Sequence, residues 1–191
     1  MKKIIAMLLA VMLVASMAAC GGNGTPAATE PKVEAPASAL EILETVWASY
    51  GEDEKFFCYG GLAGENMTEN APGKVDVTDT EGMGFTLLLP AEQAGNIDDA
   101  ASLVHGMLAN NFTCGVFHVT GDTQLFAEAM KNAVFGNQWM CGMPEKVLVT
   151  VAGGEYVLVA FGIGDAITPF QAKLTAAYPE AQQLYFEDLM Q

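Results

Sequence analysis

The chain has 191 residues and a formal charge of −15, and 51% of its residues are hydrophobic. All eight basic residues are lysines, so the chain lacks the arginine forks and basic patches on which phosphate and nucleic-acid recognition depend. Its hydrophobic content excludes a wholly disordered chain, and its length suits one ordinary domain with a core.

The first 19 residues are predicted to be a signal peptide. Lys2 and Lys3 precede an uncharged apolar run, Ile4 to Ala15, which is short for a membrane span and typical of a signal. The stretch Met17-Ala18-Ala19-Cys20 then resembles the bacterial lipoprotein signal, the lipobox, with Met17 where leucine is usual. The resemblance implies cleavage before Cys20 and attachment of a diacylglyceryl group to its thiol.

An ordinary secretory signal cut after Ala18 or Ala19 is the alternative. Residues 20–37 are rich in Gly, Pro, Ala, Thr and Glu without apolar periodicity, which predicts a flexible tether. With the leader removed, 6 lysines face 23 acidic residues, a charge of −17. We therefore expect residues 38–191 to form a single α/β domain held by lipid on the extracytoplasmic face of the cell membrane.

The first elements of this domain are a helix and a short strand. Ser38 and Glu41 form a capping-box pattern, so a helix should begin there and end near Gly51. Phe56 to Tyr59 is a strand candidate bounded by two glycines.

The segment from residue 62 to residue 111 is harder to interpret. Residues 62–84 show no lasting period, and Asp76, Asp79 and Glu81 do not fit a calcium loop, which favours an exposed acidic loop. Phe85 to Leu89 resembles a buried strand stopped by Pro90. Residues 97–109 carry apolar residues at helical spacing after an Asn96 cap, which predicts a helix.

From Phe112 onward the pattern is regular. It predicts a strand at 112–119, a helix from Asp122 to Gly136, strands at 147–151 and 156–161 joined by a Gly153-Gly154 hairpin, a helix capped at Thr168, and a last strand at 183–187. This is the order of a ferredoxin-like split βαβ fold over residues 112–187. The predicted fold class is α+β, a two-layer sandwich with both helices on one face and an N-terminal helix-and-strand extension.

This layout resembles a family of uncharacterised bacterial lipoprotein domains. The shared features are the lipobox, a polar tether, an amphipathic helix and a C-terminal α/β segment with a strand like Gly154-Glu155-Tyr156-Val157-Leu158-Val159. The resemblance implies a surface lipoprotein and assigns no functional residue beyond Cys20.

Three cysteines remain in the domain, namely Cys58, Cys114 and Cys141. A Cys114 to Cys141 disulfide is conceivable, because the predicted fold places both cysteines at the same end of the sheet. Three buried reduced thiols are the alternative. The thioethers and thiol of Met140, Cys141 and Met143 would suit Cu(I), although such residues also fill gaps beside a sheet.

The histidines offer no catalytic pair. His118 shares a strand face with Cys114, but four residues of extended chain separate them by about 13 Å, too far for a hydrogen bond. This distance favours a structural role for His118. No known catalytic or cofactor motif is present. We expect a non-enzymatic, cofactor-free domain that binds an envelope protein or small ligand; the alternative is an envelope thiol or copper protein, or an enzyme, using Cys114, Cys141 and the Met-rich loop.

Overall fold

The computed structural model describes residues 35–62, 64, 67–140 and 142–189, which lie within one compact unit. Cys20 and Cys141 are therefore outside the described residues. The strands are β1 (Cys58–Gly60), β2 (Thr68–Glu69), β3 (Gly73–Val75), β4 (Ile97–His105), β5 (Phe112–Val119), β6 (Lys146–Ala152), β7 (Tyr156–Gly162) and β8 (Gln182–Asp188). The α-helices are α1 (Ala39–Ala48), α2 (Thr80–Thr86), α3 (Thr123–Gly136) and α4 (Gly164–Ala177), with 3₁₀ turns η1 (Ala91–Asn96) and η2 (Ala109–Asn111).

The strands form one eight-stranded sheet, and all of its neighbouring strands pair antiparallel. Its order is β2-β1-β4-β5-β7-β6-β8, and β3 also pairs with β4. The α+β class is thus confirmed. The order β5-β7-β6 is a split βαβ unit, but β8 pairs with β6 and not with β5, because β4 already occupies that edge of β5. The complete ferredoxin-like order is not found.

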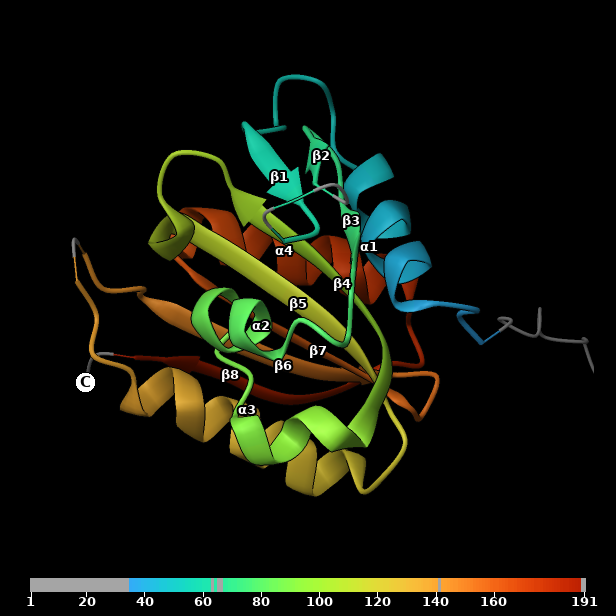
Figure 1. Cartoon of the computed structure of the whole chain (residues 1–191). Helices are drawn as coiled ribbons and strands as arrows, with labels where there is room; N and C mark the ends of the chain where they lie inside the picture. The colour runs from blue at the N-terminus through green and yellow to red at the C-terminus, as the bar shows by residue number, and fades with distance from the viewer. Residues whose placement is uncertain (1–34, 63, 65–66, 141, 190–191) are drawn as a thin grey trace, which may run out of the picture. The chain divides into compact units, whose positions relative to one another are not determined.

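Helices cover both faces of the sheet (Figure 1), with α1 and α4 on one side and α2 and α3 on the other. Along β6, Leu148 packs with the α1 and α4 core, whereas Val147 and Val149 pack with the α2 and α3 core. The crossovers β5-α3-β6 and β7-α4-β8 advance in the same direction from strands that point opposite ways, so right-handed connections place their helices on opposite faces. The prediction of both helices on one face is wrong for this reason.

Several local predictions are confirmed. The Ser38 hydroxyl accepts a hydrogen bond from the Glu41 amide at the start of α1, and Asp122 caps α3. Strand β5 has the predicted bounds. Gly153 and Gly154, with φ of 60° and 83°, form the tight turn between β6 and β7, which a side chain would strain.

Two predictions in the N-terminal half are wrong. Residues 97–105 form the central strand β4, in which Ala100 to Leu103 are all buried. A strand covered on both faces loses its alternation of apolar and polar residues, so four buried residues in a row, three of them apolar and the fourth a serine, fitted a helix equally well. Residues 85–89 contain the end of α2 and a turn in which Leu88 has a φ of 57°, so they are no strand.

The start of α4 also differs from its prediction. The helix begins at Gly164, and Pro169 lies inside it. The amide of Gly164 donates to the Glu145 carboxylate at 2.7 Å, so a residue distant in the sequence caps this helix. The local cap pattern at Thr168 could not reveal that contact.

Candidate functional site

The two ends of the sheet differ in what they carry. We call the end where β4 begins and β5 ends the proximal end. The buried Pro36 lies beside Gly153 there, since a Cβ on Gly153 would be 2.9 Å from the proline ring, so the described chain enters the fold at this end. The distal end is the opposite one, where β4 ends at His105 and β5 begins at Phe112.

At the proximal end, His118 of β5 lies between two carboxylates. Its Nδ1 is 2.5 Å from Asp98 Oδ1, and its Nε2 is 3.5 Å from Glu155 Oε2. The Tyr156 ring packs against the imidazole with 4.8 Å between ring centres. Only the protonated imidazole donates from both nitrogens, so the arrangement favours a histidinium ion.

The surrounding charges also favour the protonated form of His118. The pKa of His118 is raised, first by the hydrogen bond to Asp98 and further by Glu155, against an opposing effect of burial. The pKa of Tyr156 is also raised, first by burial and then by the charges of Asp99 and Asp98. Because carboxylates occupy both ring nitrogens, His118 ties β4 to the β6-β7 turn, and the prediction of a structural histidine agrees with this geometry.

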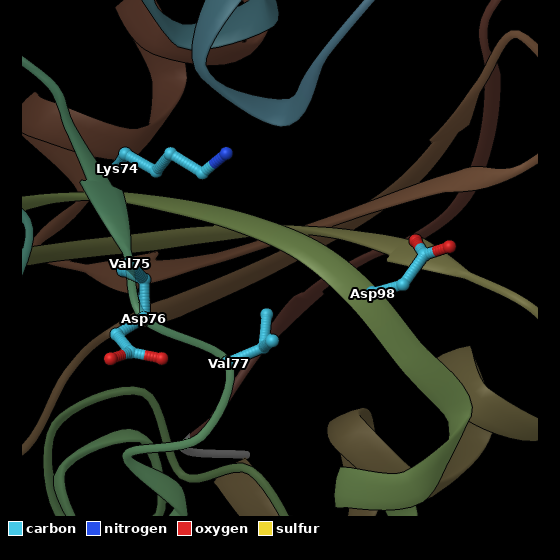
Figure 2. Close-up of a pocket in the computed structure, with 5 residues that line it drawn as sticks. All are labelled: Lys74, Val75, Asp76, Val77 and Asp98. Atoms are coloured by element: carbon cyan, nitrogen blue, oxygen red, sulfur yellow. The ribbon is translucent and has the colours of Figure 1, made fainter.

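An open groove of about 320 Å³ adjoins this cluster and is lined by Lys74, Val75, Asp76, Val77 and Asp98 (Figure 2). It exists because β3 pairs with β4 only through residues 100–102, after which the chain leaves the sheet. In Figure 2 the Asp76 carboxylate points away from Asp98.

The charged groups of the groove already have partners. Lys74 Nζ is 3.5 Å from Asp99, and Asp76 accepts hydrogen bonds from the amide and hydroxyl of Thr78. Asp98 is bound to His118. The groove is therefore lined by two valines and by charged groups that already have partners. Asp76 belongs to a local turn, in agreement with the predicted exposed acidic loop.

The described cysteines are buried and apart. Cys58 pairs with His105 and Cys114 with Leu103 on opposite sides of β4, which places their strands about 10 Å apart and prevents a disulfide between them. Burial raises the pKa of Cys58 to about 11 and that of Cys114 well above its ordinary value. Cys141 lies outside the described residues, so the Cys114 to Cys141 bridge stays a prediction.

The Met-rich loop lies at the distal end. Asn110 of η2 donates to the carbonyls of Met140 at 2.9 Å and Gly142 at 2.7 Å, which ties this loop to the β4-β5 connection. Trp139 packs against Phe161, as a gap-filling residue would. Met140 and Met143, however, are 80% and 40% exposed. This exposure could not be predicted from the residue type, because methionine is common both in cores and on binding surfaces.

Further apolar side chains are exposed nearby. Phe57 leads into β1, and Met107 and Leu108 follow β4; Met107 is 81% exposed. His105 Nδ1 accepts from the amides of Met107 and Leu108, and its ring stacks on Phe56. His105 thus supports the turn that carries these two side chains.

Among the described residues, no three His, Cys, Asp or Glu side chains are grouped so that they could hold a metal ion. Within the same residues, no helix is long and apolar enough to cross a membrane. Comparisons with protein families, with curated proteins and with solved structures found no match.

Proposed function

We propose that this chain is a lipid-anchored extracytoplasmic lipoprotein whose folded domain binds a partner and catalyses no reaction. Cys20, at the end of the lipobox-like stretch, is the residue that would carry the lipid. A second or third acyl chain would make the anchoring durable, because one chain alone binds a membrane only marginally.

The observation that supports this proposal most is that the chain entry and the exposed apolar loops lie at opposite ends of the sheet. The chain enters at the proximal end through Pro36. The loops that carry Phe57 and three of the four exposed methionines of the described residues lie at the distal end. Strands of seven to nine residues separate these ends by roughly 25 Å. An anchor upstream of Pro36 would leave the distal loops free to meet a partner.

The charge distribution supports a domain that stands away from the lipid. Each of the five lysines between residues 35 and 189 is paired with a carboxylate: Lys55 with Glu52, Lys74 with Asp99, Lys131 with Glu187, Lys146 with Asp188 and Lys173 with Glu54. The remaining acidic groups then give the protein surface a negative electrostatic potential. Anionic lipid headgroups should repel such a surface, which leaves the acyl chains as the attachment.

The test is lipid attachment in a bacterial host. The wild-type protein should incorporate labelled palmitate, pellet with membranes, withstand a high-salt wash and enter solution only with detergent. Cys20→Ser should lose the label, whereas Met17→Leu, which brings the stretch closer to the usual lipobox, should keep it. A mature protein that begins with an unmodified residue and washes off in salt would contradict the proposal.

A copper-binding role is the second candidate, and the exposure of the Met140 and Met143 thioethers favours it. After loading with Cu(I) and dialysis, elemental analysis should then find metal in the wild type and less in Met140→Leu with Met143→Leu, which keeps size and removes sulfur. Metal-free protein after loading would end this candidate.

A further inference from the structure

We infer that the distal surface, formed by Phe57, Met107, Leu108, Met140 and Met143, binds a cationic amphipathic helix of a partner protein. The inference rests on the proposed function in one respect, that the domain is a binding module. It adds the surface that binds and the chemistry of the partner.

The five side chains come from three loops that hydrogen bonds hold together. The Gly106 amide donates to the Phe57 carbonyl at 2.8 Å, and a Cβ on Gly106 would lie 2.4 Å from the Phe57 ring, so the first two loops are in contact. Asn110 then joins the second loop to the Met-rich loop through two carbonyls. The surface therefore spans neighbouring loops of the sheet's distal end.

Its frame is rigid and its side chains are adaptable. His105 holds the turn by accepting from the amides of Met107 and Leu108. Phe56 stacks on His105 and packs at a tilt against the core residue Phe112. Methionine, with three rotatable bonds and a polarisable sulfur, repacks around apolar groups of different shape. Exposed methionines on a fixed frame suit the apolar face of a helix, which presents side chains at intervals of three and four residues.

The charge around this surface is negative. Glu52, Asp53 and Glu54 occupy the turn between α1 and Phe57, and Glu145 follows Met143 two residues later. Three nearby lysines, Lys55, Lys146 and Lys173, are each paired with a carboxylate, and two of these partners are Glu52 and Glu54. Asp53 and Glu145 have no lysine partner among the described residues, so the net charge around the surface is negative. An occupant that matches both features carries apolar residues on one face and lysine or arginine beside them.

The test uses the full lipidated chain in nanodiscs of neutral phosphatidylcholine, with empty nanodiscs as the blank. The probe is a synthetic Leu/Lys peptide of about 18 residues with helical amphipathic spacing; its composition-matched scramble and a Gln-for-Lys analogue accompany it. We expect saturable binding of the amphipathic cationic peptide, at least about tenfold tighter than of either control peptide, because each control lacks one of the two matched features.

Two pairs of variants localise the binding. Met107→Gln with Met140→Gln alters two side chains that are about four-fifths exposed, so the fold should persist. This double substitution should weaken peptide binding at least about tenfold. The control, Phe85→Gln with Leu125→Gln, alters exposed apolar residues on α2 and α3 and should change it less than about twofold. Circular dichroism checks the fold of each.

Several outcomes would overturn the inference: no binding of the amphipathic peptide, equal binding of the Gln analogue or the scramble, or equal loss in both variant pairs. Self-association of the detergent-solubilised chain that Met107→Gln with Met140→Gln abolishes would also overturn it, since the occupant would then be a second copy. Stable binding to anionic vesicles through the same residues would identify a lipid surface instead. A wild-type chain that is lipid-anchored but does not bind the peptide would overturn the inference alone, whereas a wild-type chain that binds the peptide but washes off membranes in salt would contradict the proposed anchoring alone.

Discussion

His118 joins three segments of the fold at the proximal end. Asp98 and Glu155 reach its imidazole from two segments other than its own strand. Neither carboxylate is near it in sequence, and the β-bulge in β4 between Ile97 and Asp99 helps to aim Asp98. The site was therefore invisible to motif analysis, although the structural role predicted for this histidine agrees with it.

The His118 ion pair predicts a pH-dependent stability. Because the folded-state pKa of His118 is raised above its ordinary value of 6.5, the pair contributes fully below that pH and is lost as the pH rises through the folded-state pKa. In urea unfolding near pH 5.5, the free energy of unfolding of the wild type should exceed that of His118→Gln by about 0.5–1 kcal/mol. This difference should shrink toward pH 8. Asp98→Asn should remove most of this pH dependence. A difference that grows above pH 7 would contradict the assignment.

Cys58 and Cys114 should be inert in the folded protein. Burial raises the pKa of both thiols, and the thiolate is the reactive form. With iodoacetamide at about pH 8, well below the pKa of either thiol, peptide mapping should find neither residue alkylated in the native protein and both alkylated after denaturation. Rapid native labelling of Cys114 would revive the thiol-chemistry alternative.

At the scale of elements, the long-range cap of α4 gives a direct prediction. Replacing Glu145 by alanine leaves the Gly164 amide without its acceptor and should lower the free energy of unfolding by about 1 kcal/mol. Glu145→Gln keeps an acceptor oxygen and should lose less. The exposed Glu180 offers a charge-matched control, because Glu180→Ala removes a carboxylate outside the helices and strands. Equal effects of Glu145→Ala and Glu180→Ala in urea unfolding would refute the cap.

Elements with local signals were predictable, and those defined by distant contacts were not. Strand β5, the Gly153-Gly154 turn and the caps at Ser38 and Asp122 follow from residues next to one another. The sequence of strand β4 looked helical because both faces of the strand are covered. Asp98 and Asp99, which follow the predicted Asn96 cap, bind groups in other segments of the fold. Asp99, for example, accepts from the amide of Ala39 at 2.8 Å, which anchors the start of α1.

At the scale of the whole molecule, one edge contact decides the architecture. Because β4 pairs with β5, the last strand must pair with β6, and the two helices then lie on opposite faces. The element order alone could not decide between these sheets. The same arrangement places the chain entry at one end of the sheet and Met107, Met140 and Met143 at the other. The proposed function depends on this separation.

The net charge of −15 predicts that salt stabilises the domain. The five lysine pairs are surface contacts that stabilise the fold weakly, and salt weakens them further. The surplus carboxylates repel one another, and salt weakens that repulsion too. Since acidic residues outnumber lysines by 23 to 8, the repulsion should dominate. Thermal unfolding should therefore shift to higher temperature when NaCl rises from about 10 to about 200 mM, a range over which the screening length falls several-fold. The same shift with choline chloride would assign the effect to ionic strength, whereas a falling unfolding temperature would mean that the paired lysines outweigh the repulsion.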